Sequence, residues 1–110
     1  MSFTIKDMTI RDEYNRQRIF KGVNICFKGR ENQHEIYEFF DKFENDKNFR
    51  DEQYDMLTSN GVNLIRLGFT WAMLEPKKNQ FDEKIISYLK LFVDECQKRN
   101  IYIVLDLHQD

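Results

Sequence analysis

The spacing of apolar and polar side chains predicts three buried strands. The clearest are Val62 to Phe69 and Ile101 to Leu107, where apolar side chains follow one another with few interruptions. Runs of this length and composition are typical of parallel strands that are covered on both faces. Phe20 to Phe27 predicts an earlier strand, in which Gly22 permits close approach of a neighbouring backbone.

Two helices are predicted between these strands. Phe49 to Asn60 carries apolar side chains on one face, and Gly61 then ends the helix in the left-handed conformation. The second helix is capped by Asp82 or Gln80 and ends before Asn100. Its apolar side chains form one stripe: Ile85, Ile86, Leu89, Phe92, Val93 and Cys96. The order strand, helix, strand, helix, strand predicts two right-handed crossover units of a parallel sheet.

The first residues predict a short hairpin that leads into the first buried strand. Thr4 to Thr9 alternates weakly between apolar and polar side chains. Asp12 to Asn15 reads as a turn, because Asn15 tolerates a positive φ. Arg16 to Ile25 is then expected to pair back along the first strand.

Two further segments are predicted to be loops. Lys28 to Asn48 is mostly polar and has room for a short helix at His34 to Phe43, whose Phe39-Phe40-Phe43 cluster is expected to be core rather than a lipid-contacting patch. Trp71 to Gln80 is the second loop, because Pro76 cannot continue a strand.

The polar triplet His108-Gln109-Asp110 follows the last predicted strand. Barrel enzymes carry their ligand-contacting groups at the carboxyl ends of parallel strands, where side chains leave the packed interior. A complete (β/α)8 barrel takes roughly 250 residues. This chain has 110 residues, so it is expected to be part of such a barrel that ends at an active-site rim.

Composition excludes some partners and leaves others open. The chain has 17 basic and 19 acidic residues in mixed order, so neither a nucleic acid nor an anionic membrane surface is indicated. No apolar run approaches the roughly 20 residues that cross a bilayer. The start lacks an apolar signal core, so the chain as written is expected to be cytoplasmic, while the compartment stays open. Cys26 and Cys96 are expected to be buried, reduced thiols.

Arg66 interrupts an apolar strand and is the first candidate functional residue. Its guanidinium cannot lose its charge, so burial there requires a carboxylate partner. The partner could make a structural ion pair, or Arg66 could hold a catalytic carboxylate in its ionised form. The position of Arg66 near the carboxyl end of its strand favours the second interpretation.

Several other residues carry alternatives that the sequence leaves open. His108 and Asp110 share one face of an extended chain and could be metal ligands, hydrogen-bonding groups for a polyhydroxyl substrate, or a solvated end. A metal is disfavoured because only two ligands are visible and His34 lies in a loop. Trp71 could stack on a sugar ring or cover the core, and Glu75 could be an acid, a ligand or a loop hydrogen-bonding partner.

Four segments in this order resemble the opening third of glycoside hydrolase family 5. They are Lys21-Gly22-Val23-Asn24, Gly61 to Gly68, Trp71 to Pro76 and Ile103 to Asp110. Within that family, the His-Gln-Asp ending and the Trp-x-x-x-Glu-Pro loop are most similar to the endoglycoceramidase and glucosylceramidase-like branch. The resemblance implies an α/β fold, the N-terminal portion of a (β/α)8 TIM barrel, with residues 1–110 as one fragment of a single barrel domain. The N-terminal hairpin resembles the lid on the barrel floor.

The resemblance also implies roles for individual residues. Arg66 matches the arginine that orients the nucleophilic glutamate, and His108 matches a histidine that hydrogen-bonds the sugar beside the cleavage point. Asp110 and Lys28 match groups that hold terminal glucose hydroxyls, and Trp71 matches the cleft wall. The implied partner is a carbohydrate or glycolipid substrate, with no metal and no cofactor.

Family members are retaining glycosidases that use two glutamates, one of which follows an asparagine. The chain contains no Asn-Glu dipeptide, so no catalytic residue is nominated and the isolated chain is expected to be inactive and to self-associate. Two rivals stay open. One is a non-catalytic sugar-binding or regulatory half-barrel, and the other is a metal-dependent barrel hydrolase that uses His108 and Asp110.

Overall fold

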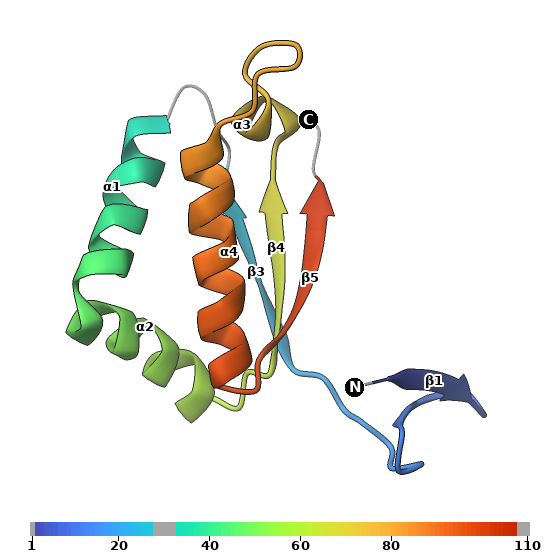
Figure 1. Cartoon of the computed structure of the whole chain (residues 1–110). Coiled ribbons are helices and arrows are strands. Elements are labelled where there is room, and N and C mark those ends of the chain that lie inside the picture. Colours follow the sequence, from blue (N-terminus) through green and yellow to red (C-terminus); the bar gives the residue numbers. More distant parts are fainter. Residues whose placement is uncertain (1, 28–32, 108–110) are drawn as a thin grey trace.

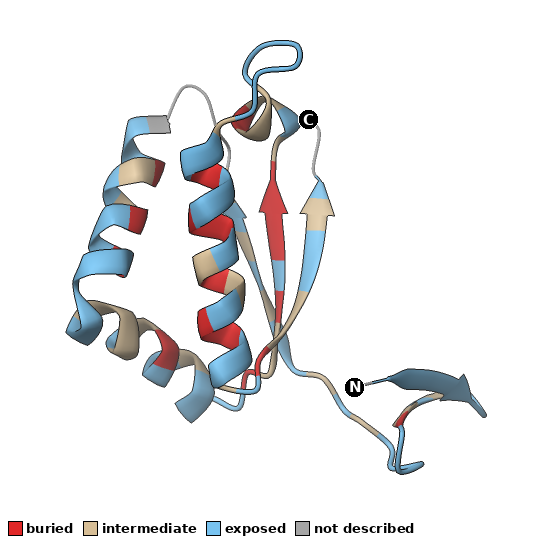
Figure 2. Ribbon diagram, in the orientation of Figure 1, coloured by how far each residue is buried: buried red, intermediate tan, exposed pale blue. Residues whose placement is uncertain are grey.

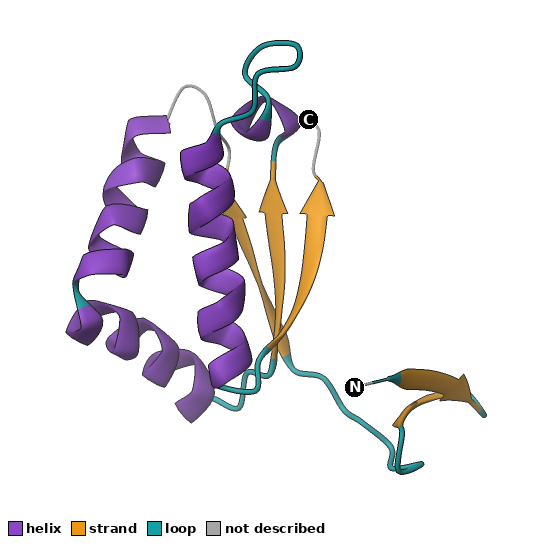
Figure 3. Cartoon of the chain, in the orientation of Figure 1, coloured by secondary structure: helices purple, strands orange, loops and turns teal. Residues whose placement is uncertain are grey.

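A computed structural model describes residues 2–27 and 33–107 as an α/β fold (Figure 1). A two-stranded hairpin precedes a three-stranded sheet, and the helices cover one face of that sheet (Figure 3). In chain order the elements are β1 (Phe3–Lys6), β2 (Thr9–Asp12), β3 (Gly22–Phe27), α1 (Gln33–Asn45), α2 (Lys47–Ser59), β4 (Leu64–Phe69), α3 (Trp71–Leu74), α4 (Glu83–Lys98) and β5 (Tyr102–Leu107).

The sheet is parallel with the strand order β3-β4-β5, which confirms the predicted crossover units. In the register, Arg66 lies between Asn24 and Val104, and the next row toward the carboxyl ends places Gly68 between Cys26 and Asp106. All three strands run in the same direction and end at one edge, beside α3 (Figure 1). This carboxyl edge is where the candidate functional residues were expected.

The N-terminal strand prediction was wrong in its extent. The predicted strand Thr4 to Thr9 is split into β1 and β2 by a two-residue turn at Asp7 and Met8, which both have positive φ (51° and 61°). Such turns join antiparallel strands because their twist matches that of the strands. The predicted second turn is present, with Asn15 at φ 60° and the Asn15 N–H donating to the Asp12 carbonyl at 3.0 Å.

Two predicted loops contain more helix than expected. Most of the first loop is α1, because Ile36, Phe40 and Phe43 recur at helical spacing and are buried while their polar neighbours face solvent. The Phe39-Phe40-Phe43 cluster is therefore core, as predicted. The second loop begins with the single-turn helix α3, and only the residues after Leu74 are irregular.

The helix ends follow the sequence prediction closely. Gly61 and Asn100 adopt positive φ (77° and 58°) directly after the C-caps of α2 and α4. The N–H of the next residue donates back into each helix, from Val62 to the Leu57 carbonyl and from Ile101 to the Cys96 carbonyl. Asp82 caps the start of α4 through hydrogen bonds from the first-turn N–H groups. Within the described residues, no helix is both long and apolar enough to span a bilayer.

The core lies between the helical layer and one face of the sheet (Figure 2). Its centre is aromatic, since rings from α1, α2 and α4 contact one another. Ile65 and Leu67 of β4 point into this layer and are fully buried. The helical predictions for α4 are confirmed by Ile85, Leu89, Phe92 and Cys96, whereas Ile86 is exposed and Tyr88 is buried in its place.

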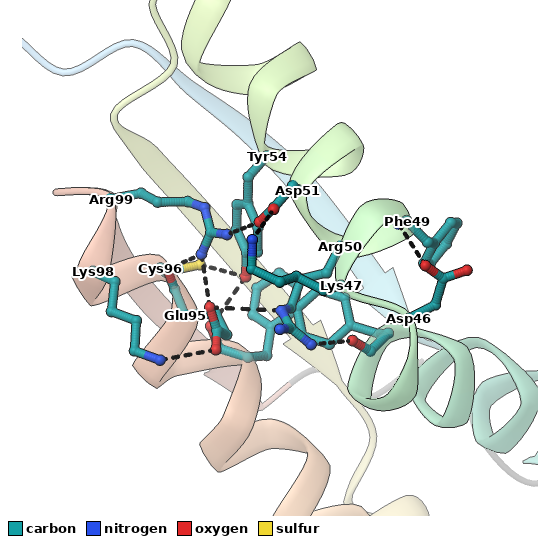
Figure 4. Close-up of polar contacts among 12 residues, drawn as sticks. Asp46, Lys47, Phe49, Arg50, Asp51, Tyr54, Glu95, Cys96, Lys98 and Arg99 are labelled. Atoms are coloured by element: carbon teal, nitrogen blue, oxygen red, sulfur yellow. Dashed lines mark hydrogen bonds and ion pairs between the residues drawn. The ribbon is translucent and has the colours of Figure 1, made fainter.

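Charged side chains join α2 to α4 outside this core (Figure 4). Arg99 donates to Glu95 at 2.8 Å and to Asp51 at 2.7 Å, and thereby links the two helices. Glu95 is 7% exposed and also pairs with Lys98 and Arg50. A nearly buried carboxylate is stable only when it is paired in this way.

Three carboxylates are more acidic in the folded chain than usual. The hydrogen bond from Arg99 holds the pKa of Glu95 below its ordinary value of 4.5, and that from Lys47 holds the pKa of Asp51 below 3.8. Burial raises the pKa of Asp12, but hydrogen bonds from the backbone and side chain of Arg16 outweigh it and lower the pKa to about 2.

The fold is therefore expected to lose stability as the pH falls below about 4. A carboxylate whose pKa is lower in the folded chain stabilises the fold above its unfolded pKa, and this contribution is lost as the pH falls toward the folded pKa. Asp12→Asn should flatten that dependence, which urea unfolding between about pH 6 and pH 3 measures. Asp94→Asn, on an exposed position of α4, is the matched control. Equal pH dependence in both variants would contradict the assignment to Asp12.

The second face of the sheet is open among the described residues. A groove of about 500 Å³ lies on it at the amino ends of the strands, lined by Phe3, Thr4, Ile5, Ile10, Phe20, Leu64, Tyr102, Ile103 and Val104. The rings of Phe3, Phe20 and Tyr102 contact one another and hold the hairpin there. The hairpin thus lies at the end of the sheet opposite the carboxyl edge, where the resemblance implies a barrel lid.

We expect the isolated 110-residue chain to form oligomers. Val104, Leu105 and Leu107 of β5 are 48%, 59% and 46% exposed, and an exposed apolar edge strand pairs readily with other chains. Light scattering after size exclusion should show species heavier than a monomer, and Leu105→Lys should reduce them. Thr58→Lys, at an exposed position of α2, is the control. A monodisperse monomer with one sharp melting transition would refute this prediction.

Candidate active site

The carboxyl edge of the sheet brings together the described candidate residues. Arg66 and Asp106 point from β4 and β5 to the open face, and Trp71 begins α3 directly after β4. Along this face the side chains change from apolar at the amino ends to polar or small at the carboxyl ends. From the amino ends to the carboxyl ends of the strands, the rows are Gly22, Leu64 and Tyr102, then Asn24, Arg66 and Val104, then Cys26, Gly68 and Asp106. The two rows nearest the carboxyl ends thus form the polar part of this face.

Arg66 forms an ion pair with Asp106. Its Nη2 donates to Asp106 Oδ2 at 2.6 Å, and the two side chains are 51% and 26% exposed. The prediction that Arg66 is buried was wrong, because the helices cover only the opposite face of β4. An ion pair this exposed contributes about 0–1 kcal/mol to stability. The main consequence of this ion pair is therefore the direction that it gives to the Arg66 side chain, and not stabilisation of the fold.

Asp106 is the partner that sequence reasoning did not assign to Arg66. The two residues are 40 positions apart in the chain and become neighbours only through the register of β4 and β5. Two neighbouring parallel strands can be aligned in the sequence by matching the ends of their apolar runs. That alignment would have placed Asp106 one row nearer the carboxyl ends than Arg66.

Trp71 and Glu75 lie in the segment that follows β4. Trp71 is 44% exposed, so much of its side chain faces solvent near the carboxyl edge and is not packed in the core. The expected role of Trp71 in the cleft wall stays a prediction. Glu75 Oε1 accepts a hydrogen bond from the Asn79 N–H at 2.9 Å. Among the three alternatives for Glu75, the structure thus shows the loop hydrogen-bonding partner.

The other predicted site residues are not placed. Lys28, His108 and Asp110 lie outside the described residues. His34 is exposed on α1. Across residues 2–27 and 33–107, no group of three His, Cys, Asp or Glu side chains could hold a metal ion.

The two cysteines are free thiols, as predicted, but in different surroundings. Cys96 is buried, and burial raises the pKa of its thiol to about 11 despite a hydrogen bond with Tyr54. A thiol with so high a pKa is unreactive at neutral pH. Cys26 is exposed on the open face, which corrects the prediction that both are buried.

Comparisons with known proteins find several endoglycoceramidases among the relatives of this chain. An endoglycoceramidase of Hydra vulgaris is 32% identical over 99 residues, which make up 90% of this chain and 18% of that protein. An endoglycoceramidase of Cyanea nozakii is 29% identical over 99 residues, with 90% of this chain and 19% of that protein covered. Endoglycoceramidase I of Rhodococcus hoagii (strain 103S) is 36% identical over 59 residues, or 54% of this chain and 12% of that protein. The chain thus spans less than a fifth of the length of these relatives.

The fold has a counterpart among solved structures. Sterylglucosidase 1 of Cryptococcus neoformans superposes with a TM-score of 0.74 at 21% sequence identity, over 93% of this chain and 16% of that one. The three consecutive parallel strands and their helices are accordingly part of a (β/α)8 barrel. The family model for cellulase (glycosyl hydrolase family 5) matches residues 18–110. The resemblance seen in the four sequence segments is therefore confirmed, and the chain belongs to glycosyl hydrolase family 5.

Proposed function

We propose that residues 1–110 are the N-terminal part of a single barrel domain that hydrolyses glycolipids with retention of configuration. The observation that carries this proposal is the position of Arg66, which projects from the open face of β4 toward the carboxyl edge. The similarity to endoglycoceramidases supports a glycolipid such as an oligosaccharyl-ceramide or glucosylceramide as the substrate.

Retaining glycosidases need two carboxyl groups roughly 5 Å apart, one as acid/base and one as nucleophile. The chain has no Asn-Glu dipeptide, so both groups are proposed to come from strands outside these 110 residues. Arg66 would hydrogen-bond the nucleophile and keep it ionised, while Trp71 forms part of the cleft wall. His108, Asp110 and Lys28 would contact sugar hydroxyls.

The reading frame after Asp110 gives the first test. An in-frame segment with a strand that ends in Asn-Glu within the next barrel units would support a larger enzyme. A stop codon that transcripts confirm would instead favour a non-catalytic sugar-binding half-barrel. For activity measurements we define the completed barrel as the product of the continued reading frame. If the frame stops, the completed barrel is this chain joined to the later strands of the Hydra vulgaris relative.

The 110-residue chain alone is expected to show no glycosidase activity. Without either carboxylate, neither proton donation nor a covalent intermediate is available. The completed barrel should release sugar from a fluorescent oligosaccharyl-ceramide under the same conditions. Turnover of a fluorogenic β-glucoside by the isolated chain, abolished by Asp110→Ala, would show that the catalytic groups have been assigned to the wrong part of the protein.

A further inference from the structure

We propose that Asp106 is a positioning residue, which holds the Arg66 guanidinium toward the carboxyl edge of the sheet. The inference rests on the proposed function of Arg66 and adds a residue to it. Asp106 would not touch the substrate or the reacting atoms. It would act only through the direction that it gives to Arg66.

The register explains how the contact aims the guanidinium. Arg66 lies opposite Val104, whereas Asp106 lies opposite Gly68, one row nearer the carboxyl ends. The side chain of Arg66 must therefore extend along the open face toward the carboxyl ends of the strands, which brings Nη2 within 2.6 Å of Asp106 Oδ2. The contact thus directs Arg66 to the end of the barrel where the chemistry of such folds takes place.

The contact leaves part of the guanidinium for a second acceptor. Within residues 2–27 and 33–107, Nη2 is the nitrogen of Arg66 that makes a hydrogen bond. A guanidinium offers five N–H donors in a rigid fork, so fixing one edge also fixes the direction of the others. A carboxylate placed above Arg66 would then meet donors that are already oriented.

In the two rows that hold Arg66 and Asp106, the other side chains that the structure describes are Asn24, Val104 and Cys26, and none of these is a carboxylate or a cationic residue. Arg18 lies over the ring of Tyr102, in the row nearer the amino ends. The pair is also too exposed for folding stability to be its main consequence. Positioning is thus the effect that the geometry supports.

The test compares Asp106→Asn, Arg66→Ala and the double variant in the completed barrel, with Asp94→Asn as the matched control. Asp106→Asn should lower kcat by about 10- to 100-fold and change KM by less than about twofold, because orientation is lost in the transition state. In the Arg66→Ala background it should cause no further loss, since the two residues act as one unit.

A second readout examines the contact itself. Arginine side-chain ¹⁵N spectra of the completed barrel should show slowed rotation of the Arg66 guanidinium. That signature should be absent from Asp106→Asn and retained in Asp94→Asn. A residue that only stabilised the fold would alter unfolding and leave both kcat and these signals unchanged.

The outcomes separate this inference from the proposed function. If Arg66→Ala lowers kcat but Asp106→Asn does not, or if their losses in kcat simply multiply, the role of Asp106 is refuted and that of Arg66 stands. If Arg66→Ala leaves kcat unchanged, the proposed function of Arg66 is refuted and the positioning role falls with it. If no variant barrel turns over substrate, unchanged Arg66 spectra in Asp106→Asn would still overturn the inference.

Discussion

Arg66→Lys should lower kcat/KM of the completed barrel by about 100-fold, although the positive charge is kept. A lysine ammonium is a point charge and cannot offer the planar fork of donors that would orient a carboxylate. It also could not hold Asp106 and a nucleophile in the same arrangement. The measurement is the pH dependence of kcat/KM with a fluorogenic β-glucoside.

The pH dependence of kcat/KM shows in which direction Arg66 shifts the pKa of the nucleophile. A guanidinium beside a carboxylate lowers its pKa by about 1–3 units, so the nucleophile is ionised at lower pH when Arg66 is in place. The acidic limb of the profile should therefore move to higher pH in Arg66→Lys. His108→Ala should weaken substrate contacts and leave that limb nearly unchanged. Equal shifts in both variants, or no shift in either, would refute the role of Arg66.

Phe40→Ala should destabilise the fold by about 3–5 kcal/mol, as large-to-small changes at buried aromatic positions do. Phe40 of α1 is fully buried, and its ring stacks on Tyr88 at 5.1 Å and contacts Phe27 at 5.0 Å. Its truncation would leave a cavity between the helices and the sheet. Because single domains are stable by only about 5–15 kcal/mol, this loss would be a large fraction of the total free energy of unfolding.

Urea unfolding followed by circular dichroism measures this effect. Phe81→Ala is the matched control, because Phe81 is 51% exposed and its truncation removes little buried surface. Phe40→Leu should recover part of the loss, since it refills some of the cavity. If the free energy of unfolding of Phe40→Ala lies within about 1 kcal/mol of that of the parent protein, the aromatic core is not what holds the helices against the sheet.

The elements with strong local signals could be predicted from the sequence. The apolar stripe of α4, the runs that become β4 and β5, and the ends at Gly61 and Asn100 depend on residues close together in the chain. Periodicity and backbone conformational preferences act over such short distances. The family motifs lie in these same segments, so the family could be identified along with them.

Other elements were harder to predict even though their signals are local. The two-residue turn at Asp7 and Met8 was missed because an apolar methionine is not a usual turn residue. In the structure the Met8 side chain is 99% exposed. The helix α1 was underestimated because acidic and amide residues surround its buried aromatic side chains. In both cases composition indicated a looser structure than the backbone adopts.

Within the candidate site, the sequence by itself determined that Arg66 lies on a strand and that Trp71 follows it. Only the tertiary structure decided which face of β4 the helices cover, and therefore that Arg66 is exposed. It also decided that Asp106 is the partner of Arg66, because their contact depends on the register between two strands. Periodicity fixes which side chains share a face of one strand, whereas the pairing of strands fixes which of them meet.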